Sequence, residues 1–210
     1  MPSTYEMKFG FPFVIGLCAI AGSSFGQEHS SKESQGKVFC PVCVANGYAS
    51  STTAAGKDWF ITGNSVGGAL WYQGIDRLQI GVGFHSSSEA VRGLFSYRLI
   101  PNLGRDLGLN IGYGFQNQES GATGVSSTLE WNPRLERGSL NVYAGASRQT
   151  DARNRFIYGA KWSPDGVWFV GNQFDGRDHN PFFQRSFGHY SVGLIYVAGK
   201  RVSLSAGYQF

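Results

Sequence analysis

From about Asp58 to the last residue, apolar and polar residues alternate with a period of two. This period is typical of β-strands that have one apolar face. The alternation is clearest over residues 78–85, 109–116, 140–147 and 202–210. It recurs over 91–99, 125–131, 156–162 and 190–196, and it is poorest over 167–174, where both faces are partly apolar. The pattern therefore predicts an all-β body over residues 58–210, opened by a strand near 65–72.

Short segments rich in Pro, Asn, Asp and Gly separate these strands, as expected for tight reversals of the chain. They lie at 73–76, 101–106, 132–138, 163–166 and 198–200. The strand after each turn begins about thirty residues after the previous one, which indicates a repeated hairpin. We therefore predict an antiparallel up-and-down transmembrane β-barrel of about ten strands, with eight as the alternative count. Residues 175–186 are expected to form a long connection.

The face opposite the apolar one consists mostly of Gly, Ser, Asn, Gln and Thr. Only 15% of the chain is charged, which is too little for a water-facing sheet surface. This composition favours a barrel with its polar face inside and its apolar face in lipid. The residues predicted to line the lumen are Arg92, Arg98, Glu130, Lys161, Asn110 and Asn141. Aromatic girdles are expected from Tyr97, Trp131, Trp162, Trp168 and Tyr196 beside the turns, and from Phe84, Phe115, Phe174 and Phe210 at the other ends.

The N-terminal quarter of the chain has a different composition. Residues 1–26 are typical of a signal peptide, because Lys8 precedes an apolar run over 9–20 and small residues follow. Residues 27–57 are predicted to be a flexible periplasmic arm. The arm contains Cys40 and Cys43, which most simply form a local disulfide in an exported protein, although an intermolecular contact stays open.

The last strand, residues 202–210, alternates and ends on an aromatic residue. It resembles the C-terminal signal of Gram-negative outer-membrane β-barrel proteins, and residues 199–208 also resemble the hairpins of YaiO-like outer-membrane barrels. The resemblance implies that Tyr208 and Phe210 form an assembly signal for the barrel-assembly machinery. It also implies a location in the cell outer membrane, in contact with its lipid and lipopolysaccharide. With Phe210 in the periplasm the tight turns face outside, which is the reverse of the usual pattern; either the external loops are small or a strand is miscounted.

Residues that could carry chemistry are sparse. His189 and Ser191 lie two apart on a predicted strand, a spacing that resembles outer-membrane lipid A deacylases, but Val192 replaces the Asn of that family and no acid is near. We therefore predict no catalytic site. His29, His85 and His179 are too scattered to predict a metal site, and we expect no cofactor.

The excess of Lys and Arg over Asp and Glu, 18 against 14, is unclustered and does not favour nucleic acid. It suits lipopolysaccharide phosphates, for which the candidates are Arg105, Arg134, Arg137, Lys200 and Arg201. The alternative is ordinary turn charge.

Together these patterns predict a non-enzymatic outer-membrane barrel that acts as a small pore or a transport or secretion component. A closed structural or anchoring barrel is the alternative, a lipid-modifying enzyme is a third interpretation, and a soluble ligand-binding barrel is an alternative fold. Because many predicted lumen residues are glycines, we expect a thinly lined, weakly anion-preferring passage. The sequence leaves homo-oligomer formation open.

Overall fold

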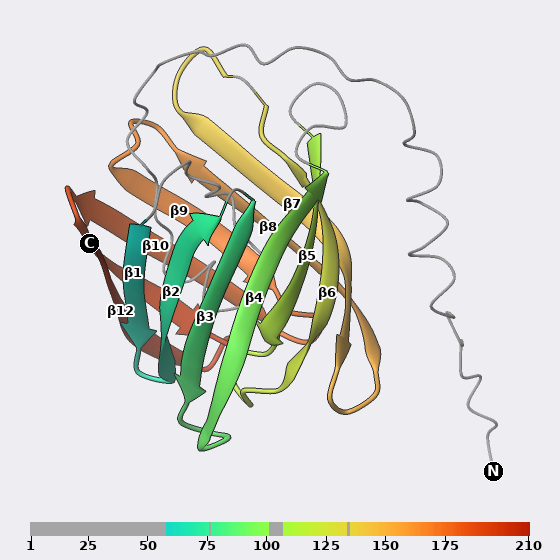
Figure 1. The fold of residues 1–210 in the computed structure, drawn as a ribbon. Helices are drawn as coiled ribbons and strands as arrows, with labels where there is room; N and C mark the ends of the chain where they lie inside the picture. The colour runs from blue at the N-terminus through green and yellow to red at the C-terminus, as the bar shows by residue number, and fades with distance from the viewer. Residues whose placement is uncertain (1–57, 76, 101–106, 134) are drawn as a thin grey trace. The chain divides into compact units, whose positions relative to one another are not determined.

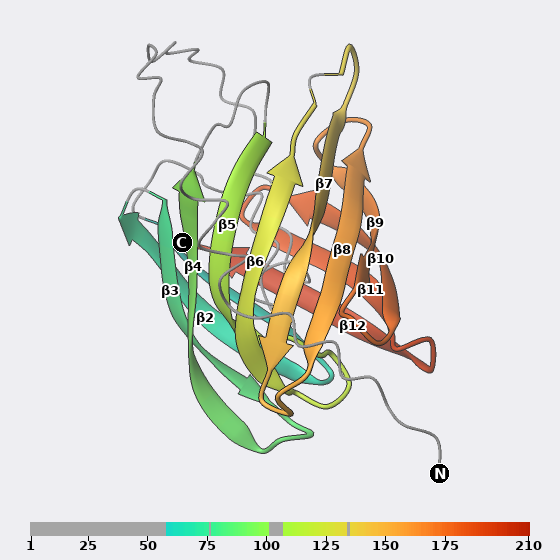
Figure 2. The same cartoon turned by 90° about the vertical axis from the view of Figure 1, so that its right-hand side faces the viewer.

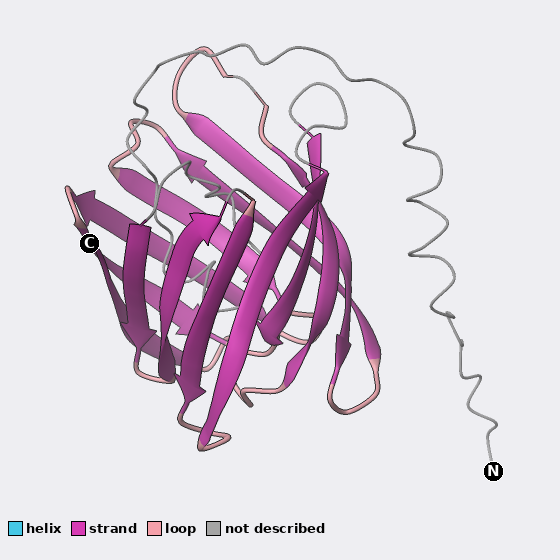
Figure 3. Ribbon diagram, viewed as in Figure 1, coloured by secondary structure: helices cyan, strands magenta, loops and turns pink. Residues whose placement is uncertain are grey.

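The computed structural model describes residues 58–75, 77–100, 107–133 and 135–210, and these residues form an antiparallel β-barrel (Figures 1 and 3). The predicted signal peptide, the arm with Cys40 and Cys43, Arg105 and Arg134 lie outside the described residues. The strands are β1 (Asp58–Asn64), β2 (Gly67–Ile75), β3 (Leu78–His85), β4 (Ala90–Ile100), β5 (Leu107–Phe115), β6 (Thr123–Trp131), β7 (Ser139–Gln149), β8 (Asn154–Ser163), β9 (Trp168–Phe174), β10 (His179–Phe187), β11 (Tyr190–Val197) and β12 (Arg201–Gln209). In the described part of the chain, no helix is long and apolar enough to span a membrane.

Each strand pairs with its neighbours in sequence, and β12 pairs with β1 to close the ring. The closing ladder runs from Phe60 opposite Gln209 to Asn64 opposite Ser205. The prediction of an all-β antiparallel barrel is thus confirmed, but the expected count of about ten strands is wrong. The barrel has twelve strands, and the two that were missed are β1 and β10.

Strand β10 was missed because its sequence does not alternate cleanly. Residues 175–186, expected to be a connection, include Pro181 followed by two adjacent phenylalanines, Phe182 and Phe183. Proline cannot donate a ladder hydrogen bond. Pro181 fits because the pairing of β10 with β11 begins one residue later, at Phe182 opposite Ile195.

The two missed strands also change which end of the barrel each turn occupies. We call the end where β1 starts and β12 finishes the terminal end; it carries the connections at 76–77, 101–106, 132–138, 164–167 and 188–189. The distal end carries those at 65–66, 86–89, 116–122, 150–153, 175–178 and 198–200. Tyr196 therefore lies at the distal end, although it was expected at the same end as Trp131 and Trp162. Phe210 lies at the terminal end, although it was expected at the same end as Phe84. Both ends have short connections, so the expected reversal of loop lengths came from the miscount.

Side chains alternate between the inside and the outside of the wall. Figure 2 shows strands β5 to β8 of this wall from the outside. In β11, Ser191 and Ile195 are buried, whereas Val192 and Leu194 are 44% and 48% exposed. Large apolar residues are exposed on the outer face of every strand except β2 and β7, where they are partly exposed. Phe115 is the exception to the predicted pattern: it was expected outside, but it is 5% exposed and lies 5.5 Å from the His85 ring inside the barrel.

The interior is filled by large side chains that lie over glycines on the neighbouring strand. A Cβ atom added at Gly159 would lie 2.5 Å from Tyr143, and one at Gly171 would lie 2.5 Å from Phe182. These glycines are paired in register with the residues that cover them. The buried apolar side chains form two clusters, one of Tyr143, Ile157, Phe182, Ile195, Val197 and Ala198, the other of Phe60, Ala69, Trp71, Leu94 and Phe115. This filling corrects the expectation of a thinly lined lumen.

Candidate functional site: the polar interior

A buried carboxylate organises the polar residues on one side of the interior. Glu130 on β6 is 2% exposed. Its two oxygens accept hydrogen bonds from Asn110 Nδ2 on β5, at 2.7 Å, and from Asn141 Nδ2 on β7, at 2.5 Å. The guanidinium of Arg98 on β4 lies 3.8 Å from the same carboxylate, with an 11% exposed side chain. Three strands around β6 thus direct polar groups at one acid, which compensates the cost of burying its charge.

Lys161 adds a second cation to this cluster. It lies on β8 in register with Asn141, is buried, and has its Nζ atom 5.9 Å from the centre of the Phe169 ring. We call Arg98, Asn110, Glu130, Asn141 and Lys161 the Glu130 cluster. The cluster thus places two cationic side chains, Arg98 and Lys161, on strands to either side of the buried Glu130 carboxylate.

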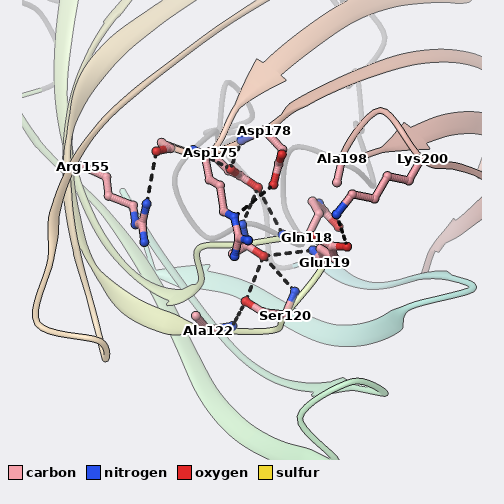
Figure 4. A network of polar contacts seen from close by, with 12 residues as sticks. Gln118, Glu119, Ser120, Ala122, Arg155, Asp175, Asp178, Ala198 and Lys200 are labelled. Carbon is pink, nitrogen blue, oxygen red and sulfur yellow. Dashed lines mark hydrogen bonds and ion pairs between the residues drawn. The ribbon is translucent and has the colours of Figure 1, made fainter.

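A second polar cluster closes the distal end around Asp175, which follows β9 and has no exposed surface (Figure 4). One carboxylate oxygen accepts from the backbone N–H groups of Arg177 and Asp178, at 3.0 and 2.9 Å. The other accepts from Asn117 Nδ2 at 3.0 Å and from the N–H of Gln118 at 3.3 Å. Burial raises the pKa of the Asp175 carboxyl, although these hydrogen bonds act in the opposite direction.

The loop at 116–122, between β5 and β6, supplies two of the partners of Asp175, Asn117 and Gln118, and reaches across the mouth of the barrel. His85 Nε2 is 3.1 Å from the Gln118 carbonyl oxygen, and Lys200 Nζ is 2.6 Å from Glu119 Oε1. Lys200 belongs to the β11–β12 turn, which is half a ring away from the β5–β6 loop in the strand order. Lys200 also lowers the pKa of the Glu119 carboxyl. The loop is therefore fastened to opposite walls, and we call it the closing loop.

The structure brings five of the six predicted lumen residues into the Glu130 cluster. The sixth, Arg92, has the inward register on β4 but is exposed, and its guanidinium donates to the carbonyl of Val91 at 3.0 Å. Of the predicted assembly residues, Tyr208 contacts Phe210 edge-on with ring centres 5.0 Å apart, and the Phe210 N–H donates to the Trp59 carbonyl. His189 is exposed in a turn, whereas Ser191 is buried inside.

Sequence reasoning missed the closing loop. Its buried residues Gln116, Asn117 and Gln118 form a run of polar amides directly after an apolar strand. Such a run normally indicates an exposed turn. The signal that could have distinguished it is the length of the segment, which exceeds that of its neighbours at the distal end.

Comparisons with known proteins do not assign the chain to a family. No family model matches the chain, and no match was found among the curated proteins or the solved structures. Within the described residues there is also no group of three or more His, Cys, Asp or Glu side chains that could hold a metal ion. The similarity to outer-membrane barrels therefore stays a prediction.

Proposed function

We propose that this protein is an integral outer-membrane β-barrel with a closed lumen and a structural or anchoring, non-enzymatic role. The observation that carries the proposal is the polarity of the wall. Apolar side chains such as Val82, Leu194 and Leu204 are 45%, 48% and 62% exposed on the outside, while Glu130 and Lys161 are buried inside. A water-soluble barrel has the opposite arrangement, and an apolar surface this extensive requires lipid or another partner.

The aromatic residues of the outer face support a membrane location. At the terminal end, Trp59, Trp131, Trp162 and Tyr190 are between 45% and 60% exposed. At the distal end, Phe84, Phe156 and Tyr196 are exposed, and Tyr158 Oη lies 3.4 Å from His179 Nε2. Aromatic rings with polar tips are favoured where hydrocarbon meets the headgroups, so the two groups suit the two surfaces of a bilayer.

The filled interior favours a closed barrel over an open pore. Trp71 and Phe169 are at most 1% exposed, and the closing loop is fastened across the distal end. An open channel would leave the inward side chains in contact with solvent. The structural or anchoring alternative is thus better supported than the pore that the sequence favoured.

A small pore or transport component is the second candidate, because the closing loop is held through polar contacts. Glu119 and Lys200 form an exposed ion pair, whereas the hydrogen bonds to Asp175 are buried. An exposed ion pair contributes little to stability, so the attachment to Lys200 is the weaker one. The Glu130 cluster lies nearer the terminal end, so a passage opened by displacing the loop would reach Arg98 and Lys161 only after crossing the interior, where these cations would favour anions.

Two partners belong to this proposal. The class implies that the barrel-assembly machinery recognises Phe210, and that the terminal end lies in the periplasm. The distal end would then meet lipopolysaccharide phosphates through Lys200 and Arg201. Of the other candidates, Arg137 lies at the terminal end, away from that surface.

The test combines cell fractionation with recordings in planar bilayers. We expect the full chain in the outer-membrane fraction, and no steady conductance from the purified protein. Recovery in the soluble fraction would refute the membrane location, and steady conductance of the wild type would favour the pore. For the second candidate, residues 117–121 are replaced by two glycines. If this variant conducts, Arg98→Gln should reduce its preference for anions, while the exposed Arg92→Gln serves as the matched control.

A further inference from the structure

One arginine of the outer face lies among aromatic rings. Arg185 on β10 is exposed and is paired in register with Trp168 on β9. The central carbon of its guanidinium lies 4.5 Å from the centre of the Trp168 ring and 4.6 Å from the centre of the Phe187 ring. Contacts of this kind hold a guanidinium in a defined position, since the rings attract its positive charge.

The hydrogen-bonding groups of this guanidinium are available to a ligand. Among the described residues, no carboxylate forms a salt bridge with Arg185. Backbone hydrogen bonds and, to a smaller extent, the positive charge of Arg185 lower the pKa of the Asp165 carboxyl. Asp165 Oδ1 itself already accepts hydrogen bonds from the N–H groups of Val167 and Trp168, at 2.8 and 2.9 Å. A guanidinium stacked on rings keeps its N–H donors in its own plane, where they suit an oxyanion with two acceptor atoms.

The position of Arg185 along the wall indicates which oxyanion would meet it. Trp168 and Phe187 begin and end their strands at the terminal end, and Phe187 pairs with the 60% exposed Tyr190. These residues belong to the aromatic group that suits the membrane surface. An arginine on the lipid face is costly at the middle of a bilayer and tolerated near its surface. At that depth the abundant anion is the phosphate group of a lipid.

We propose that Arg185, Trp168 and Phe187 form a binding site for the phosphate group of a glycerophospholipid, with the lipid chains lying along the apolar wall beside β10. The guanidinium would donate to the phosphate oxygens, and the two rings would hold it in place. This inference rests on the proposed membrane location, and it adds a ligand that the location alone does not specify.

The test uses the purified full chain in detergent, with dioleoyl phosphatidylglycerol as the probe and native mass spectrometry as the readout. Dioleoylglycerol, which has the same chains without the phosphate, is the control ligand. We expect Arg185→Gln to reduce phosphatidylglycerol binding about tenfold, the size of effect that a lost charged hydrogen bond produces. Arg137→Gln removes the same charge at the same end and should leave binding unchanged. Trp168→Leu should weaken binding while retaining the charge.

Equal binding to the wild type and to Arg185→Gln would overturn the site. Equal binding of dioleoylglycerol, or displacement of the lipid by an equal concentration of inorganic phosphate, would also overturn it, since neither fits a lipid phosphate. Heat-modifiable migration on gels identifies any variant that fails to fold. If Arg185→Gln fails to fold, Arg185→Lys is used in its place. Fractionation separates the two proposals: soluble protein refutes the membrane location, whereas membrane protein without lipid selectivity refutes this site alone.

Discussion

Individual glycines decide how the interior of this barrel packs. The ring of Tyr143 occupies the space where a side chain at position 159 would lie, and it is 4% exposed. Glycine at 159 is therefore required by the approach of the ring rather than by backbone conformation. The same argument holds for Gly171 beneath Phe182. Gly159 and Gly171 are thus recesses for large residues on the next strand rather than part of a thin lining.

Replacing Gly159 by Ala should destabilise the barrel, because the added methyl group forces the buried Tyr143 ring to move. We expect a loss of about 1–3 kcal/mol in the free energy of unfolding, as for other overpacked sites. Urea titration in detergent, followed by tryptophan fluorescence, measures it. Gly93→Ala is the matched control, since no atom lies within 4 Å of its added Cβ. Equal stability of the two variants would show that the recess is not tight.

Asp175→Asn tests the charge at the centre of the distal cluster. The amide cannot accept all the hydrogen bonds that both carboxylate oxygens accept, so we expect a loss of about 1–3 kcal/mol at pH 7. Burial raises the folded-state pKa above its ordinary value of 3.8. The folded protein then binds the proton more tightly, so the wild type loses stability as pH rises from 3.8 through the raised pKa.

The stability gap between the wild type and Asp175→Asn should therefore widen on acidification, measured by urea titration at several pH values. For Asp165→Asn we expect the opposite change of the stability difference with pH. Backbone N–H groups lower the pKa of Asp165, so its contribution is lost as pH falls, and its gap should narrow. A gap that narrows for Asp175→Asn would contradict the raised pKa.

At the scale of elements, the barrel closes through its two terminal strands. β12 pairs with β1 along five registered positions, and the N–H of Phe210 extends this ladder to the carbonyl of Trp59 at 2.9 Å. The ring of Phe210 is 63% exposed and contacts Tyr208 edge-on. An exposed aromatic ring at the last position contributes little to packing, which suits a residue that another protein recognises.

Deleting Phe210 should impair assembly more than it impairs stability. We expect less heat-modifiable protein in membranes, measured by gel migration at equal expression. Phe210→Ala keeps the backbone bond to Trp59 and should share most of the defect if the ring is the signal. Val202→Ala, at the distal end of the same strand and 66% exposed in the wild type, is the control. Normal assembly of both Phe210 variants would argue against a terminal signal.

At the scale of the whole molecule, the described part of the barrel has an apolar outside, while its inside combines buried polar side chains with two apolar clusters. Buried Gln79, Gln173 and Gln184 lie within the same wall that exposes Ile80, Val170 and Phe183. Each strand contributes side chains to both faces of a closed sheet. A barrel with an apolar outer face is therefore suited to lipid, whereas one with a polar outer face is suited to water.

Cysteine labelling tests this polarity in intact membranes. In a background where Cys40 and Cys43 are serine, Val82→Cys should resist a water-soluble thiol reagent, because the proposed membrane location would cover the outward face of β3 with lipid. Ser87→Cys, in the exposed turn at 86–89, should react readily. Labelling is read from the mass of the purified protein. Rapid reaction at position 82 would show that water reaches the outer wall.

The alternation from Asp58 to Phe210 by itself determined that the body is an all-β antiparallel barrel and that its wall has two faces of different polarity. It could do so because strand periodicity is local, so that residues two apart share a face whatever lies across the sheet. Only the tertiary structure decided the strand count, the exchange of ends for Tyr196 and Phe210, and the inward turn of Phe115. It alone also joined Glu119 to Lys200, which are 81 residues apart. These features depend on register and on contacts between distant segments, and a local period of two carries no information about either.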